Sequence, residues 1–192
     1  MDQKEKMKLD ILAEIDGYYM NLVYLEDLIK VDKHMETSQS INELAPNFSL
    51  IVKCALVDSY MLSLMKLYDK SEKAKTIPNL IQKCKKNIQL FCSPSEVSKM
   101  LEVFEKKLSN DKYISCAIEI IRLRRDRYHA HNDKKYFGEK IKEDESHLSK
   151  YHVWFLVDFT AEVVYYIWKH LSDEKCRETK YKNDLDNLLK RG

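Results

Sequence analysis

The sequence predicts an all-α protein, a single-domain helical bundle of six or seven helices. Glycine and proline are scarce, at three residues each in 192, whereas sheets and α/β folds need many more turn residues. Apolar residues recur at steps of three and four over long stretches, which is the period of a helix with one buried face.

The chain is long enough for one sizeable core, since a domain of this size buries roughly two-thirds of its unfolded surface. No internal repeat or low-complexity tract divides it. We therefore expect one domain over residues 1–192, with a charged C-terminal helix from about Glu174 to Arg191.

The first helix is expected from near Lys4 to about Val31, with Gly17 inside it. Its apolar stripe consists of Leu9, Leu12, Ile15, Tyr19, Leu22, Leu25 and Leu28. A glycine lowers helicity locally without ending a helix. Residues 33–45 are polar and are expected to form a loop, in which Ser40 and Glu43 have the spacing of a capping box.

Pro46 suits the first turn of a second helix, which runs on through Phe48 to Leu67. This helix is apolar on most of its circumference, so we expect it to be central. Asp58 and Lys66 are its polar exceptions, two turns apart. They are expected to form a buried ion pair, or alternatively to line a cleft.

Three further helices have clear starting signals. After a charged loop over residues 71–76, Pro78 opens one helix, and Ser93, Pro94 and Glu96 open the next, which ends near Asp111. A helix then starts at about Asp111 with a buried stripe of Ile114, Ala117, Ile118 and Ile121. Stepping on by four places Arg125 on the line of that stripe.

A long helix rich in aromatic residues is expected over residues 148–171. Its large side chains are expected to fill the core or a dimer interface. They are Trp154, Phe155, Tyr165, Tyr166 and Trp168.

Charge and cysteine content narrow the classes of function. The net charge is only +2, which provides no global basic field of the kind found in dedicated nucleic-acid binders. Five scattered cysteines without a CxxC pair indicate reduced thiols, several of them in the core, and a cytoplasmic protein. No apolar run approaches the roughly twenty residues that span a bilayer, so no membrane association is expected.

The stretch RRDRYHAHND, residues 124–133, carries the densest cluster of chemistry-bearing side chains. It can be the basic C-terminal end of a helix, where cations oppose the helix dipole. The spacing His129, His131 and Asp133 also resembles part of the zinc signature of metallo-β-lactamase-type hydrolases, but Lys134 stands where that signature has histidine.

A third interpretation is acid–base chemistry on RNA without a metal or other cofactor. Cleavage of a phosphodiester needs a base for the 2′-hydroxyl proton and a fixed cation for the phosphate charge. Histidine titrates near neutral pH, and arginine offers a fork that matches phosphate oxygens. Arg125 and His131 supply such a pair.

The stretch from Arg125 to His131 resembles the R-x(4–6)-H motif of the HEPN superfamily, with Asp126 as the polar residue after the arginine. The sequence Ala130-His131-Asn132-Asp133 is similar to the AbiU-like abortive-infection branch. So is the segment Lys66-Leu67-Tyr68-Asp69, and the resemblance extends over about residues 5–175.

This resemblance implies a helical bundle that forms a homodimer around the motif and, in many members, cuts RNA without a metal. Arg125 and His131 would then carry the reaction, supported by Asp126. It equally leaves open a non-catalytic module that binds a nucleotide, RNA or a partner protein such as an antitoxin.

Further residues around the motif remain candidates. His129 allows an alternative pair with Arg124, and Asp133 is a possible supporting carboxylate. Tyr128 and Tyr136 flank the motif and are expected to pack against the aromatic helix, or alternatively to stack on bases.

Overall fold

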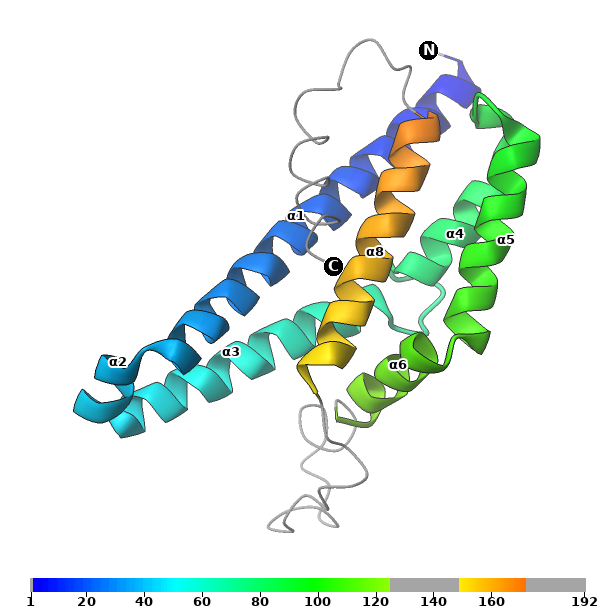
Figure 1. Cartoon of the computed structure of the whole chain (residues 1–192). Helices are drawn as coiled ribbons and strands as arrows, with labels where there is room; N and C mark the ends of the chain where they lie inside the picture. The colour runs from blue at the N-terminus through cyan, green and yellow to red at the C-terminus, as the bar shows by residue number, and fades with distance from the viewer. Residues whose placement is uncertain (1, 125–148, 172–192) are drawn as a thin grey trace.

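The computed structural model describes residues 2–124 and 149–171 (Figure 1), and every element in these two ranges is a helix. The prediction of an all-α fold is confirmed. The elements are α1 (Gln3–Thr37), α2 (Gln39–Leu44), α3 (Pro46–Leu67), α4 (Ile77–Lys86), the short 3-10 helix η1 (Ile88–Leu90), α5 (Pro94–Asn110), α6 (Lys112–Arg124) and α8 (Lys150–Leu171). The expected C-terminal helix lies outside the described residues.

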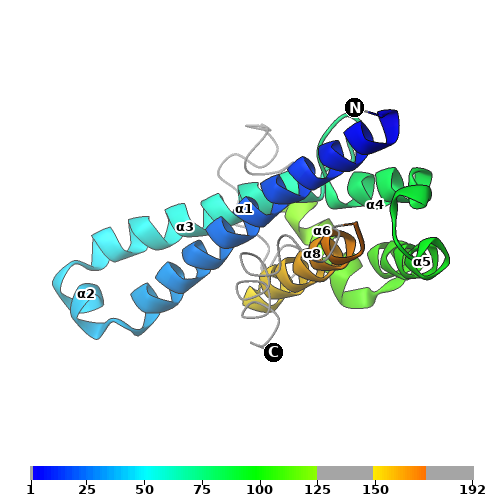
Figure 2. The same cartoon turned by 90° about the horizontal axis from the view of Figure 1, so that it is seen from above.

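The helices form a body and a projecting arm. Helices α1 and α3 run side by side, joined at their far end by α2, and this pair extends well beyond the rest of the molecule (Figures 1 and 2). The body consists of α4, α5, α6, α8 and the near ends of α1 and α3. Helix α8 packs against both α1 and α6, so it connects the arm to the body.

The core of the body forms where α5, α6 and α8 meet. Phe104 on α5 is fully buried and makes edge-to-face contacts with Phe159 and Tyr166 of α8, with ring centroids 6.1 and 5.6 Å apart. The predicted stripe of α6 is confirmed in full, since its four apolar members are all buried. The helix periodicity in the sequence therefore identified the inward face of α6 correctly.

The prediction of a loop over residues 33–45 is wrong. Helix α1 continues to Thr37, and α2 follows after Ser38. Asp32 and Met35 are both buried, at 7% exposure each, so tertiary contacts hold the last turns of a helix whose local sequence is polar. Ser40 lies inside α2, whose N-cap position is Ser38, so it does not begin the helix as expected. Glu43 instead accepts a hydrogen bond from the side chain of Gln39 at 2.6 Å.

The prediction that α3 is central along its whole length is also wrong. Apart from Ser49, its buried residues begin at Tyr60, while Phe48 and Ile51 are 60% and 67% exposed. Only the second half of α3 enters the core, because the first half extends along the arm, where it packs against α1 and α2. Composition could not separate these halves, since both are apolar.

Helix α3 also changes the assessment of membrane association. By length and composition alone, its 22 residues are apolar enough to cross a bilayer, and 33% of its apolar 18-residue stretch is buried in the protein. The expectation that no apolar stretch reaches this length is therefore wrong. Part of this apolar character belongs to the core, where Met61 and Leu64 are fully buried.

The expected buried ion pair within α3 does not form. Asp58 and Lys66 are both exposed. Among the four cysteines that the structure describes, Cys84 is buried and Cys54, Cys92 and Cys116 are exposed, so fewer of these thiols fill the core than predicted. Single polar or thiol side chains carry little positional information until the neighbouring helices are known.

Candidate functional site

The predicted motif begins at the last described residue of α6. Arg124 is half-buried at the C-terminal end of this helix. The other predicted site residues lie outside the described residues: Arg125, Asp126, Tyr128, His129, His131, Asp133 and Tyr136. What the structure provides is the scaffold that leads into the motif.

Helix α6 is held at its N-terminal end by a carboxylate. The side chain of Asp111 accepts hydrogen bonds from the backbone N–H of Tyr113 at 2.9 Å and of Ile114 at 3.1 Å. An Asp at this position satisfies N–H groups that have no partner inside the helix and favours the positive end of its dipole. The buried stripe then fixes the rotation of α6 about its axis.

The C-terminal end of α6 is tied to the end of α3. Arg122 donates from Nη2 to the backbone carbonyl oxygen of Tyr68 at 2.9 Å. Tyr68 follows directly after α3, in the segment that resembles the AbiU-like branch. A bond from a charged donor is stronger than a neutral one, so it restrains the last turn of α6 two residues before the motif.

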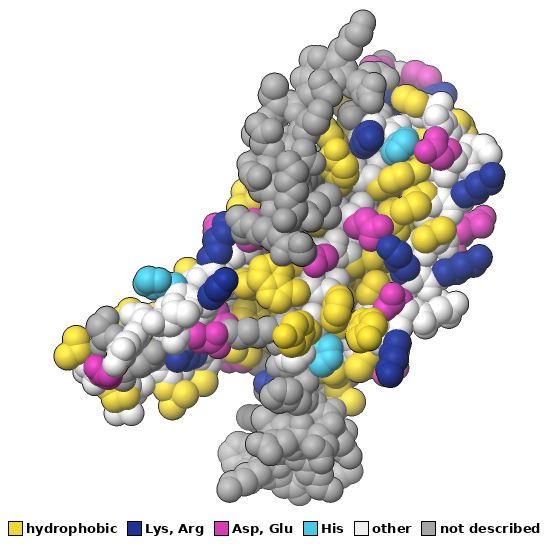
Figure 3. All heavy atoms as spheres, in the orientation of Figure 1, with side chains coloured by type: hydrophobic (Ala, Val, Ile, Leu, Met, Phe, Trp, Pro, Cys, Tyr) yellow, Lys and Arg dark blue, Asp and Glu magenta, His cyan; other side chains and the backbone are white. Residues whose placement is uncertain are grey.

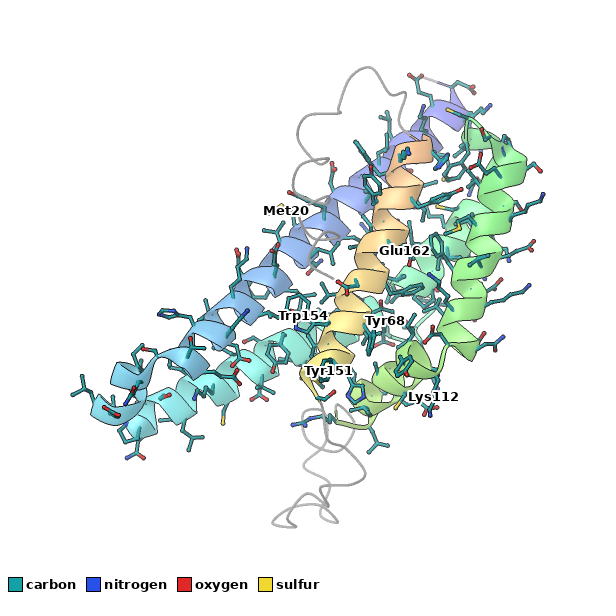
Figure 4. All side chains as sticks on the ribbon, in the orientation of Figure 1. Met20, Tyr68, Lys112, Tyr151, Trp154 and Glu162 are labelled. Atoms are coloured by element: carbon teal, nitrogen blue, oxygen red, sulfur yellow. The ribbon has the colours of Figure 1, made fainter. Side chains whose placement is uncertain are left out.

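The hydroxyl of Tyr68 extends this connection to α8 (Figure 4). It lies 3.0 Å from the carbonyl oxygen of Leu156 and 2.6 Å from Oγ1 of Thr160. Oγ1 of Thr160 lies 2.7 Å from the same carbonyl oxygen, so two hydroxyls and one carbonyl form a hydrogen-bonded cluster inside the core. Burial raises the pKa of Tyr68, which keeps its hydroxyl protonated. One residue therefore joins the ends of α3 and α6 to α8.

A cavity of about 380 Å³ opens where the arm meets the body. It is lined by Ile29, Asp32, Lys33 and Glu36 of α1, Tyr60 of α3, and Tyr151, Val153 and Trp154 of α8. Trp154 lies between α8 and the arm, and Tyr151 lies at the first turn of α8 (Figure 4). The volume of the cavity falls within the range of small-molecule sites, roughly 300–1,000 Å³.

The charge of Arg124, at the end of α6, acts on Tyr60, which lines this cavity. Burial and the charge of Asp32 raise the pKa of Tyr60 to about 12, while the charge of Arg124 acts in the opposite direction. Glu36 and Asp58 add smaller raising effects. The charge of Arg124 therefore acts on Tyr60, so the cavity lies within electrostatic range of the residue at which the motif begins.

Sequence reasoning missed the cavity residues of α1 and α3. Asp32 lies at the boundary of the expected first helix, and Tyr60 lies on a helix expected to be core. The sequence does contain a signal for Asp32. It follows Leu22 and Leu25 at helical spacing, so a charged residue lies on the buried face of the helix. Which helices surround that residue depends on the fold.

Two lysines beside Cys84 form ion pairs within the protein. Lys83 pairs with Glu14 at 2.8 Å, and Lys85 pairs with Glu105 at 2.6 Å. The basic run around Cys84 therefore braces α4 against α1 and α5. In the portion of the chain covered by the structure, no cluster of three or more potential metal ligands occurs.

Comparison with known proteins agrees with the resemblance seen in the motif. The family model HEPN_AbiU2 (AbiU2) matches residues 8–191, nearly the whole chain. No curated protein and no solved structure matches the chain. Since the family model extends over far more than half of the sequence and the described fold is entirely helical, the chain belongs to the AbiU2 family of HEPN proteins, modules of the abortive-infection type.

Proposed function

We propose that this HEPN protein is a metal-independent endoribonuclease that cuts single-stranded RNA. The observation that carries the proposal is the anchoring of α6 immediately before the R-x5-H sequence, through Arg122 and Tyr68. The reaction needs a base and a cation in fixed positions, and a firmly held helix immediately before them helps to keep both in place. Membership of the AbiU2 family supports the same assignment.

In the proposed reaction, His131 takes the proton of the ribose 2′-hydroxyl, and the 2′-oxygen bonds to the adjacent phosphorus. The bond from phosphorus to the 5′-oxygen breaks, and that oxygen takes a proton from water. Arg125 binds the phosphate oxygens as negative charge develops, and Asp126 orients the arginine. The products are a 2′,3′-cyclic phosphate and a 5′-hydroxyl end.

The test is cleavage of a labelled single-stranded RNA by purified protein in excess chelator. His131→Ala and Arg125→Ala are each expected to lower the rate by at least about a hundredfold, the usual contribution of a positioned acid or base. Helicity and Tm are expected to stay close to those of the wild type. His129→Ala serves as the matched control on the other histidine.

Three outcomes would change the assignment. A larger loss with His129→Ala would transfer the role to the Arg124 and His129 pair. Activity that depends on added zinc would favour a metal hydrolase. RNA binding without cleavage would leave a non-catalytic module, the alternative that the resemblance also allows.

The same proposal includes a homodimer built on α6 and α8. The aromatic pair of Tyr113 and Phe155, stacked with centroids 5.1 Å apart, remains exposed on these helices and supports an interface there. A two-fold interface brings two copies of the motif together without new sequence. Sedimentation of the wild type and of Tyr113→Glu checks it, and a wild-type monomer at micromolar concentration would contradict it.

A further inference from the structure

The cavity between the arm and the body has the chemistry of a binding site that the cleavage reaction does not use. Three of its lining side chains are aromatic, Tyr60, Tyr151 and Trp154, and two are carboxylates, Asp32 and Glu36. Asp32 is buried at 7% exposure. Figure 3 shows hydrophobic side chains gathered over the first turns of α8, with acidic ones close by.

This lining selects against several classes of ligand. Among the described residues of the lining, a phosphate would face two carboxylates, Asp32 and Glu36, and a single cation, Lys33. A divalent metal requires more oxygen ligands than the described residues bring together. A purely apolar ligand would leave the buried carboxylate of Asp32 facing hydrocarbon, which is costly. A flat ring with polar hydrogens on one edge satisfies both the aromatic walls and the carboxylates.

We infer that the cavity receives a guanine base of the RNA substrate. Among the bases, guanine presents two adjacent donors, N1–H and the N2 amino group, and a carboxylate accepts both at once. An ionised carboxylate has about four acceptor positions, so Asp32 can serve the base and a protein partner together. The aromatic side chains provide surfaces on which an unpaired base stacks.

The hydroxyl of Tyr60 is expected to recognise O6, the third polar group on the same edge of guanine. Guanine carries an acceptor, O6, beside its two donors, and a protonated phenol can donate to it. Burial and the charge of Asp32 hold the pKa of Tyr60 at about 12, so the hydroxyl remains a donor at neutral pH. Adenine carries an amino group where guanine has O6, and an acceptor, N1, where guanine has N1–H. Adenine therefore offers Tyr60 no acceptor at this position and offers Asp32 no pair of donors.

The position of the cavity connects it to the reaction, and this inference rests on the proposed function. Arg124 influences Tyr60 electrostatically, and the next residue along the chain is Arg125. The link between the cavity and the cleaved phosphate is therefore part of the inference, and it rests on the chain continuing from Arg124 directly into the motif. The expected result is a ribonuclease that prefers RNA with guanine next to the cut.

Binding can be measured separately from cleavage. The probe is a 2′-O-methyl dinucleotide, which lacks the attacking hydroxyl, titrated while the fluorescence of Trp154 is followed. GpU is expected to bind at least about tenfold more tightly than ApU or than IpU, whose hypoxanthine lacks the N2 amino group. Trp168, the second tryptophan, is buried at 6% exposure and gives a constant background.

Variants test the residues directly. Asp32→Asn is expected to abolish the difference between GpU and IpU, and Tyr60→Phe to reduce it. Glu36→Gln, at an exposed position that tolerates substitution, is expected to weaken GpU binding by a few-fold. Asp10→Asn, an exposed aspartate at the other end of α1, is the matched control and should bind like the wild type.

The outcomes separate this inference from the proposed function. RNA cleavage without guanine preference, together with equal binding of GpU and ApU, would overturn the guanine site and leave the ribonuclease intact. Guanine-selective binding that Asp32→Asn removes, without any RNA cleavage, would keep the site and reject the ribonuclease. Preferential binding of spermidine would overturn the inference in favour of an organic cation.

Discussion

Tyr68 connects three helices through its side chain and its backbone. It is 1% exposed, its hydroxyl reaches α8, and its carbonyl oxygen accepts from Arg122 of α6. Residues that meet three elements usually restrain all of them. Here the restraint acts on the last turn of α6, two residues before the motif begins.

The hydroxyl of Tyr68 can be removed without disturbing the ring. Tyr68→Phe is expected to lower the free energy of unfolding by about 1–2 kcal/mol, because the buried bonds to Leu156 and Thr160 are lost. Urea unfolding followed by circular dichroism measures it. The control is Tyr113→Phe, whose ring is 61% exposed and which should be neutral. Equal effects of the two changes would contradict the role of Tyr68.

At the scale of the element, α1 is both the longest helix described and one that contains a glycine. Gly17 lies in its interior on an exposed face, and a Cβ there would meet no atom within 4 Å. Nothing in the packing therefore requires glycine at this position. The residue costs α1 stability through the backbone entropy of the unfolded chain.

Gly17→Ala is expected to raise the free energy of unfolding by about 0.5–1 kcal/mol, the usual difference between the two residues inside a helix. Ala13→Gly, one turn earlier at another exposed position, is the reciprocal control and should lower it by a similar amount. Chemical unfolding of both variants measures the difference. A loss of stability with Gly17→Ala would contradict the open space found around Gly17.

At the scale of the whole molecule, the core contains several ionisable groups that must stay protonated. Burial, the largest cause, raises the pKa of Tyr18 and of Tyr68, and raises that of the Cys84 thiol to about 12 from its ordinary 9.0. In the unfolded chain these groups release their protons at ordinary values. Stability from this source is therefore complete below pH 9 and is lost as the pH rises toward 12.

Urea unfolding between pH 8 and pH 10.5 should show this loss, with a slope of up to about 1.4 kcal/mol per pH unit for each group. Cys84→Ala is expected to flatten the first part of the decline, from pH 9 upward, because this thiol ionises first in the unfolded chain. A constant unfolding midpoint up to pH 10.5 would contradict the burial of these groups.

The sequence by itself determined the helical class, the start of most helices and the inward face of α6. Those properties are local: proline and aspartate begin helices, and apolar residues at steps of three and four mark one face. The motif that pointed to the HEPN superfamily is likewise a short stretch, and the AbiU2 family model agrees with it.

Only the tertiary structure decided which helix faces are buried against one another and which stay exposed. It extended α1 to Thr37, exposed the first half of α3 and brought Asp32, Tyr60 and Trp154 around one cavity. These residues are far apart in the chain, and each fits an ordinary helix. Burial depends on which helices pack together, so a local pattern cannot reveal a site that three helices build jointly.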